Sequence, residues 1–233
     1  MGVDIVNAFL AAGDRVLVGS RTAAGPDGDA VKYVSVDVRV PASLRSFVDE
    51  ALRWTGRLDV FVNNAGFSEW RRIERVYEPF WETMIDTNLK GTFFGCQAAA
   101  AELRSGGCIV NISSLAGRRG SANNSVYCAS KFGVNGITQA LAKELGPRGI
   151  RVNAVCPVYV RTDGLLTALQ SEDAPPLGVE VSRYLADFSQ TQAALGRLPN
   201  GSEVARACAF LASAEASAIT GQCVHVDCGV LPQ

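Results

Sequence analysis

The chain has 233 residues, enough for one α/β domain with a full core and too few for two. Its formal net charge of −1 argues against general attraction to nucleic acid or to an anionic membrane. No apolar run approaches the ~18 residues that a membrane span needs, and residues 1–10 lack the basic region and cleavage site of a secretory signal. These properties predict one domain over residues 1–233, located in the cytoplasm, with neither a nucleic-acid nor a membrane partner.

Short β-branched runs alternate along the chain with amphipathic helical stretches, which is typical of a parallel sheet covered by helices on both faces. The runs predict strands at 15–19, 31–36, 58–63, 108–113, 151–155 and 222–226. Helices are predicted at 4–12, 42–54, 78–88 running on into 91–103, 126–145 and 202–212. A turn rich in glycine and proline is predicted between Arg21 and Val31.

Residues 163–200 break this rhythm. They follow a strand but contain two predicted helical pieces, at 164–170 and 179–196, split by Asp173-Ala174-Pro175-Pro176. A long excursion that leaves the C-terminal end of a parallel strand is where a substrate lid would sit.

Seven cysteines are scattered without a C-x-x-C pair, so neither a zinc site nor a disulfide framework is predicted. We expect reduced, mostly buried thiols and no metal. The single histidine, His225, stands in an apolar strand-like run. A packed strand residue is therefore a better interpretation of His225 than a member of a Ser-His-Asp triad.

Ser114, Tyr127 and Lys131 carry the strongest chemical signal. Tyr127 and Lys131 are four residues apart in a predicted helix, so their side chains share one face. A neighbouring ammonium is expected to lower the pKa of a tyrosine from its usual value of roughly 10 toward the range useful for proton transfer. Ser114 follows a strand, at the end where α/β sheets place their sites. Taken alone, a Tyr-x3-Lys pair is better explained by two solvated helix residues.

Further segments join these three residues in a consistent pattern, and with them the sequence resembles the short-chain dehydrogenase/reductase family from Gly2 to Gly229. The order and spacing of the segments are those of the family, which makes the resemblance highly specific. The matching segments are Asn63-Asn64-Ala65-Gly66, Asn88 in TNLKG, Asn111-Ile112-Ser113-Ser114, Tyr127 to Lys131, Ile219-Thr220-Gly221 and Val226-Asp227-Cys228-Gly229.

The resemblance implies a Rossmann-type, doubly wound parallel sheet in a three-layer α/β/α arrangement. It also implies hydride transfer between a nicotinamide and a carbonyl or alcohol carbon, with Asn88, Ser114, Tyr127 and Lys131 as catalytic residues. In that scheme Tyr127 is the general acid/base, and Lys131 lowers its pKa and binds the nicotinamide ribose. Ser114 orients the substrate oxygen, and Asn88 holds a water relay.

Cofactor contacts follow from the same resemblance. Ser20 and Arg21 come directly after the strand at 15–19, where relatives that prefer NAD carry an acid. Because a guanidinium forms charge-assisted bonds to a phosphate, NADP(H) is predicted over NAD(H), although Arg21 could instead be a solvated loop residue. The other implied contacts are Asp37 and Val38 beside the adenine, Asn64, Ala65 and Gly66 beneath the adenosine ribose, Val160 and Thr162 at the carboxamide, and Tyr127 and Lys131.

The N-terminus departs from the family pattern. The family opens with a strand and a Thr-Gly-x3-Gly-x-Gly turn, and Gly2 corresponds to the last glycine of that turn. The first strand and most of the glycine-rich turn are therefore missing from the chain, and with them the glycines that let a backbone approach a diphosphate. Because that strand lies between the strands at 15–19 and 58–63 in the family, two unpaired inner edges are predicted.

Three interpretations of this departure stay open. The chain could be a fragment or mis-started version of a full enzyme, or its sheet could close up or borrow a strand and keep weakened redox activity. In the third, the fold serves chemistry without a nicotinamide and keeps Tyr127 and Lys131 as an acid/base pair. Val158, where the family has glycine, favours the third because a β-branched side chain would crowd the nicotinamide.

The sequence thus predicts an NADP(H)-dependent oxidoreductase, a ketoreductase or alcohol dehydrogenase, that acts on a carbonyl or secondary alcohol of a largely apolar small molecule. The alternative is a non-redox relative, either a cyclase, dehydratase or isomerase, or a silent scaffold. Resemblance also implies a homo-oligomer, a homotetramer or dimer, through the helices at 91–103 and 126–145 and the final strand. Candidate pocket walls are Phe67, Trp70, Leu115, Ala116, Tyr159 and the 163–200 excursion.

Overall fold

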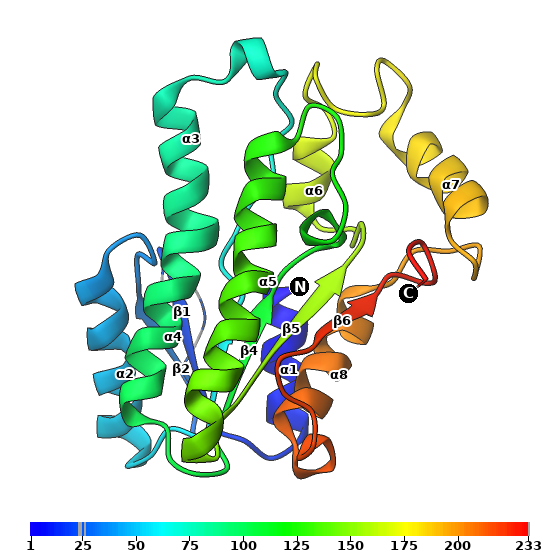
Figure 1. Cartoon of the computed structure of the whole chain (residues 1–233). Helices are drawn as coiled ribbons and strands as arrows, with labels where there is room; N and C mark the ends of the chain where they lie inside the picture. Colours follow the sequence, from blue (N-terminus) through cyan, green and yellow to red (C-terminus); the bar gives the residue numbers. More distant parts are fainter. Residues whose placement is uncertain (23–24, 26, 233) are drawn as a thin grey trace.

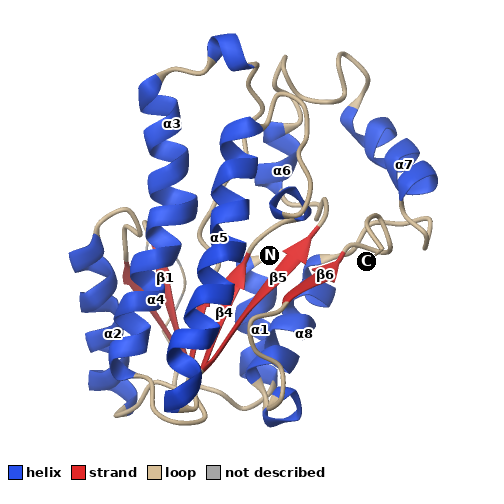
Figure 2. Ribbon diagram, in the orientation of Figure 1, coloured by secondary structure: helices blue, strands red, loops and turns tan. Residues whose placement is uncertain are grey.

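Parallel strands form a central layer with helices on both faces (Figures 1 and 2). The structure is a computed structural model that describes residues 1–22, 25 and 27–232. Its architecture is the parallel, doubly covered α/β arrangement that the alternation of strands and helices predicted, and it is of the Rossmann type that the resemblance implied. None of the helices in this part of the chain is long and apolar enough to cross a membrane.

The strands lie within two residues of their predicted ends, and all pairing between them is parallel. They occur in two sheets, with the order β1-β2 in one and β3-β4-β5-β6 in the other. The strands are β1 (Val16–Ser20), β2 (Val31–Ser35), β3 (Val60–Asn63), β4 (Cys108–Ile112), β5 (Arg151–Pro157) and β6 (Cys223–Val226).

Local sequence explains where several helices begin and end. Pro41 opens the second helix, where its missing N–H costs nothing, and Gly56 ends it with a φ of 77° that favours glycine. The helices are α1 (Gly2–Ala11), α2 (Pro41–Thr55), α3 (Glu78–Ile85), α4 (Gly91–Glu102), α5 (Ser125–Leu145), α6 (Asp163–Ala168), α7 (Val181–Gln192) and α8 (Gly201–Ala212). Short 3-10 turns are η1 (Ile73–Arg75), η3 (Leu115–Gly117), η4 (Gly146–Arg148) and η5 (Ala214–Ala216), and η2 (Asp86–Lys90) is a π-helical turn.

The two faces of the sheet bury different helices because side chains alternate along each strand. Ile109 packs into a core with residues of α2, α4 and α5. Its neighbours Cys108 and Val110 pack on the other face with residues of α1 and α8. Figure 1 shows the same two helical layers, with α6 and α7 standing beyond the C-terminal ends of the strands.

The sheet is interrupted between β1 and β3. Within the described residues β1 pairs only with β2, and β3 pairs only with β4. All five residues of β4 are buried, whereas most residues of β1 and β3 are only partly buried. The two unpaired inner edges predicted from the sequence are therefore confirmed, and the sheet has not closed up over them.

Some predicted boundaries are wrong for local reasons. The second helical piece of the excursion ends at Gln192 rather than 196, because Ala193 turns to extended backbone and Gly196 takes a φ of 60°. The helix that carries Tyr127 continues as a 3-10 turn past Gly146, and Gly149, with a φ of 71°, ends it. Part of the turn predicted between Arg21 and Val31, namely residues 23, 24 and 26, lies outside the described residues.

The cysteines are free thiols in the structure. Five of them are buried, and two on or after the last strand, Cys223 and Cys228, are partly buried. Burial raises the pKa of the Cys96 and Cys208 thiols to about 12. His225 lies in β6, where it was predicted as a strand residue, and its Nδ1 lies 3.1 Å from the carbonyl oxygen of Leu231.

Candidate active site

The predicted site residues follow the C-terminal ends of successive parallel strands. Ser20 ends β1, Asn64 follows β3 and Ser114 follows β4 by two residues. Because the strands run in one direction, these ends meet at one edge of the sheet, and Figure 2 shows loops along that edge. The fold therefore gathers these predicted site residues at one edge of the sheet, and their role as a site stays a prediction.

Tyr127 and Lys131 share one face of α5, as their spacing predicted. The Nζ atom of Lys131 lies 5.7 Å from the centroid of the Tyr127 ring. Lys131 is buried, and its ammonium donates a hydrogen bond of 2.8 Å to the carbonyl oxygen of Ile112, at the end of β4. This bond ties α5 to the strand that leads to Ser114.

Ser114 completes the group. Its Oγ accepts a hydrogen bond of 3.1 Å from the backbone N–H of Ala116 and so caps the 3-10 turn that follows β4. A hydrogen bond also joins the side chains of Ser114 and Tyr127. The structure thus brings Ser114, Tyr127 and Lys131 together.

Burial dominates the protonation of both titrating groups. It raises the pKa of Tyr127 to about 12, against a smaller lowering by the hydrogen bond to Ser114. This is opposite to the direction predicted from the sequence, because loss of hydration at the phenolate outweighs the one lowering cause, the hydrogen bond to Ser114. Burial also lowers the pKa of Lys131 to about 8, which weakens the ammonium on which that prediction relied.

Asn88 lies in the π-helical turn η2 and is fully buried. Its Oδ1 accepts from the N–H of Phe67 at 3.0 Å, and its Nδ2 donates to the Phe67 carbonyl at 2.8 Å. The amide therefore clamps the main chain just after Gly66. π-turns inside α-helices occur frequently at functional sites. A water relay at Asn88 stays a prediction, whereas the clamp is visible in the structure.

The predicted cofactor-binding residues differ in how buried they are and in what they contact. Asp37 forms an ion pair of 2.6 Å with Arg39, and that hydrogen-bonded partner lowers the pKa of Asp37 to about 2. Val160 is buried beside Ile5 of α1, whereas Arg21 is exposed after β1. Of the remaining predicted contacts, Val38 packs against Gly91, Thr162 caps α6, Ser20 is partly buried, and Ala65 and Gly66 are exposed.

Candidate walls of the substrate pocket separate into three clusters. Phe67 packs beside Tyr127, and Leu115 packs with Ala193 and Val158. Trp70 and Tyr159 form the third cluster with residues of α6 and α7, their ring centroids 6.3 Å apart. The excursion is thus in contact with two predicted walls. Ala116 contributes its backbone N–H to Ser114.

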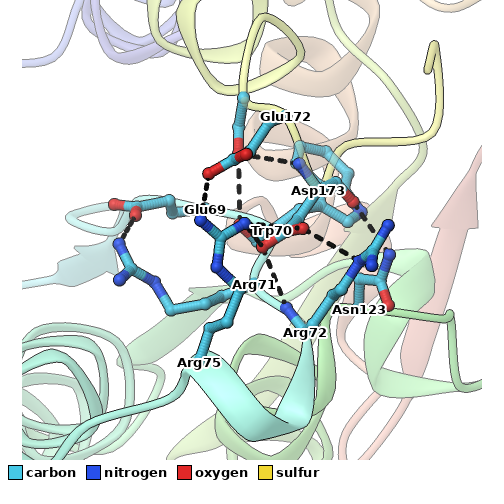
Figure 3. A network of polar contacts seen from close by, with 9 residues as sticks. Glu69, Trp70, Arg71, Arg72, Arg75, Asn123, Glu172 and Asp173 are labelled. Carbon is cyan, nitrogen blue, oxygen red and sulfur yellow. Dashed lines mark hydrogen bonds and ion pairs between the residues drawn. The ribbon is translucent and has the colours of Figure 1, made fainter.

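A polar network fastens the excursion to the segment that follows β3 (Figure 3). Asp173, which is 4% exposed, forms ion pairs with Arg72 at 3.1 Å and with Arg75 at 3.2 Å. Sequence analysis missed this network. The two arginines are visible as an i, i+3 pair, but nothing in the local sequence joins them to an aspartate about a hundred positions later.

Among the described residues, no group of three or more His, Cys, Asp and Glu side chains could hold a metal ion. The parallel α/β sheet with Ser114, Tyr127 and Lys131 at its C-terminal edge defines the class of Rossmann-fold oxidoreductases.

Comparison with known proteins identifies the family. A sequence model of the family described as enoyl-(acyl carrier protein) reductase matches residues 1–231. An uncharacterised oxidoreductase of Methylorubrum extorquens is 38% identical over 219 residues, which is 94% of this chain and 83% of that protein. The 3-oxoacyl-(acyl-carrier-protein) reductase of Staphylococcus aureus is 36% identical over 199 residues, 84% of this chain and 76% of that protein. The chain belongs to the short-chain dehydrogenase/reductase family.

Solved structures agree with this assignment. A variant of actinorhodin polyketide ketoreductase with NADPH superposes with a TM-score of 0.87 at 29% identity, covering 98% of this chain and 92% of that one. The ligand-free aldohexose dehydrogenase of Thermoplasma acidophilum also superposes with a TM-score of 0.87, at 31% identity, covering 100% of this chain and 92% of that one. The predicted family and fold class are therefore confirmed.

The family implies a nicotinamide cofactor, and the residues beside Lys131 fit one. Oδ1 of Asn64 is buried without a hydrogen-bond partner, so it is a ready acceptor for a ribose hydroxyl. An added Cβ at Gly66 would lie 3.1 Å from Oδ1 of Asn88 and 3.5 Å from Nζ of Lys131, so glycine keeps this space open. At the diphosphate end the structure offers the first turn of α1, where the N-terminal ammonium lies 3.1 Å from Asp4.

Proposed function

We propose that the protein is an NADP(H)-dependent ketoreductase or alcohol dehydrogenase that acts on a carbonyl or secondary alcohol of a largely apolar small molecule. The observation that carries the proposal is the junction of Ser114, Tyr127 and Lys131, in which a phenol and an ammonium share one helix face beside a serine hydroxyl. Neither a packing role nor a solvated surface requires these three groups at one strand end.

Each residue has a defined part in the proposed reduction. A nicotinamide cofactor, when bound, would supply the hydride for the carbonyl carbon. Tyr127, with a pKa of about 12, is protonated at neutral pH and donates its proton to the carbonyl oxygen. Ser114 would hold that oxygen by a hydrogen bond, and Lys131 would contact the nicotinamide ribose. Oxidation of an alcohol uses the same groups in reverse, with the Tyr127 phenolate as the base.

Cofactor preference is proposed from Ser20 and Arg21. Arg21 is exposed directly after β1, near enough to Asp37 to help lower the pKa of that carboxyl, and its guanidinium could form charge-assisted bonds to a ribose 2′-phosphate. Asn64, Ala65 and Gly66 would hold the adenosine ribose, and Val160 and Thr162 the carboxamide. One of the similar solved structures is a polyketide ketoreductase with NADPH, which supports the same preference.

We assign the substrate a largely apolar character because Trp70 and Tyr159 stand where the excursion meets the sheet edge.

A homo-oligomer is proposed as well, since Phe93 of α4 and Phe132 of α5 are 42% and 49% exposed. A cytoplasmic location is proposed from the free thiols. Light scattering decides the oligomeric state, and a monomer would contradict that part.

Replacing Tyr127 by phenylalanine tests the catalytic role. The substitution removes only the hydroxyl, so kcat/KM for reduction of a cyclic ketone by NADPH should fall by about 10²- to 10⁴-fold. The Kd for NADPH, measured by fluorescence enhancement, should change by less than about threefold, because the ring stays in place. Unchanged turnover in this variant would reject Tyr127 as the acid.

Binding of NADPH to the wild-type protein separates the two function classes. Micromolar binding, tighter than for NADH, supports the reductase. If folded protein binds neither nucleotide, the open edges of β1 and β3 favour the second candidate, a non-redox enzyme that uses Tyr127 and Lys131 for proton transfer.

A further inference from the structure

Asp173 is a buried carboxylate outside the catalytic group. Its side chain is 5% exposed and lies in the irregular segment between α6 and α7. Burying a charge is costly unless hydrogen bonds and an opposite charge compensate for it. The surroundings of Asp173 provide both the hydrogen bonds and the opposite charges, so the folded protein holds this carboxylate in place despite the cost of burying it.

All of the partners of the carboxylate come from one short segment after β3. Oδ2 accepts from the backbone N–H of Arg72 at 3.2 Å, and Oδ1 meets Nε of Arg72 at 3.1 Å. Nη1 of Arg75 donates to both carboxylate oxygens, at 3.2 and 3.3 Å. Arg75 also pairs with the exposed Glu172. Figure 3 shows both arginines reaching the same turn of the excursion.

The main chain of Asp173 makes a second connection. Its carbonyl oxygen accepts a hydrogen bond of 3.0 Å from Nδ2 of Asn123. Asn123 lies two residues before α5, the helix that carries Tyr127, and its own carbonyl accepts from the N–H of Arg71 at 2.6 Å. One turn of the excursion is therefore joined to the segment after β3 and to the start of the catalytic helix.

Trp70 lies inside this junction. It is 4% exposed, packs against Leu169 and Leu185 of the excursion, and accepts a hydrogen bond of 3.3 Å at its carbonyl from Ser171. Its ring faces that of Tyr159, which follows β5. A shift of the turn at Asp173 would therefore move both aromatic rings that stand beside the sheet edge.

We propose that Asp173 is a positioning residue that fixes the first half of the excursion, residues 163–177, as a rigid wall of the substrate pocket. It acts through Arg72, Arg75 and Asn123 on the Trp70 and Tyr159 side of the site. This part of the excursion is consequently a fixed wall that selects substrates by ring size, and not a lid that swings open. The pocket role rests on the proposed reductase function, whereas the fastening does not.

Asp173→Asn tests the fastening without turnover. The amide keeps the shape of the side chain but loses the charge that pairs with two arginines. Hydrogen exchange of the backbone amides at 163–177 should accelerate by about tenfold or more, with β4 and β5 unchanged. Asp187→Asn, the same substitution at an exposed position of α7, is the matched control and should leave this exchange unchanged. Equal exchange in both variants overturns the proposal.

Steady-state kinetics then test the positioning role. For a bicyclic ketone, 1-tetralone, Asp173→Asn should raise KM by about tenfold while kcat changes by less than about threefold, because the wall moves and the acid does not. For cyclohexanone, KM should change far less. A fall in kcat for both ketones at constant KM would indicate loss of folded enzyme only, and would reject the positioning role.

Arg75→Gln is a milder second variant, which keeps the proposal testable if Asp173→Asn fails to fold. It removes one of the two cations, from a side chain that is 45% exposed, and should give an exchange rate and a KM between those of wild type and Asp173→Asn. If wild-type protein reduces no ketone, the proposed reductase function fails. The exchange experiment still decides whether Asp173 fastens the excursion.

Discussion

Lys131 shows how a single buried side chain can lower the stability of the folded protein. Its ammonium is 4% exposed and has one hydrogen bond to a carbonyl, that of Ile112. Its pKa falls from 10.5 to about 8 in the folded protein. At pH 7 the group is protonated in both the folded and the unfolded chain, so burial of the charge opposes folding.

A pH-dependent difference follows for Lys131→Met. Between pH 8 and 10 the unfolded chain holds the proton more tightly than the folded one, so the free energy of unfolding gains about 1.4 kcal/mol per pH unit from Lys131. Below pH 8 this gain is absent. The methionine variant should therefore be more stable than wild type at pH 7, by about 2 kcal/mol after the lost hydrogen bond is counted, and the gap should close toward pH 10.

Urea unfolding of both proteins at pH 7, 8, 9 and 10 measures this gap. Taking the difference between the two proteins cancels the titration of the buried thiols, which they share. A gap that stays constant with pH would contradict the lowered pKa.

Residues that act through local spacing could be predicted from the sequence, and residues that act through distant contacts could not. Tyr127 and Lys131 are one helical turn apart, so their common face follows from helix geometry alone. The hydrogen bonds of Asn88 with the main chain of Phe67 could not be predicted, because they depend on the π-turn, which no spacing in the sequence indicates. The partners of Asp173 needed the tertiary fold.

At the scale of elements, close approach between α4 and β3 depends on one glycine. A Cβ at Gly95 would lie 2.2 Å from Oδ1 of Asn63. Asn63 donates to Oδ1 of Asn111 at 2.9 Å, and Asn111 donates to Thr138 of α5 at 3.0 Å. This ladder of buried side chains links β3, β4 and α5, so a methyl group on α4 would disturb all three.

Gly95→Ala should therefore lower the free energy of unfolding by about 2–4 kcal/mol, through overpacking and loss of buried hydrogen bonds. The matched control is Gly136→Ala on α5, where an added Cβ meets nothing within 4 Å. There the same substitution should raise stability by about 0.5–1 kcal/mol, because alanine is the better helix former. Thermal unfolding measures both, and equal effects would contradict the packing argument.

The positions of helices and strands were predictable to within a few residues. The spacing of apolar residues and the glycines and prolines that end an element are both local features of the sequence. The predicted strand at 151–155 is β5 (Arg151–Pro157), and the predicted helix at 42–54 is α2 (Pro41–Thr55). The end of α7 was predicted poorly because Ala193 and the two residues after it look helical by composition. Tertiary contacts of Ala193 with Leu115 and Val230 draw the chain into extended backbone there.

At the scale of the whole molecule, the sheet is interrupted between β1 and β3. Among the described residues, the inner edge of each of these strands has no strand partner, so its backbone N–H and C=O groups form no ladder there. Both strands run in the same direction, so one further parallel strand would pair with both. α1 begins at the C-terminal edge of the sheet, and a strand joined to its N-terminus would form a right-handed β-α-β unit with β1.

An engineered N-terminal extension tests this arrangement. Five alternating β-branched residues and a glycine-rich turn, fused before Met1, should slow hydrogen exchange in β1 and β3 and tighten NADPH binding by about tenfold. The control carries proline at the centre of the new strand, because proline cannot donate to a ladder. Equal protection with and without the proline would show that the gap does not accept a strand.

The buried thiols have a practical consequence for measuring the life of the folded state. Five cysteines are inaccessible in the native protein, and only Cys223 and Cys228 are partly open. A small alkylating reagent should label those two quickly and the other five only in molecules that have opened. The rate at which these five sites are labelled therefore reports the rate at which the folded protein opens. Mass spectrometry can measure this rate in wild type and in every variant, without a fluorescent or spectroscopic probe.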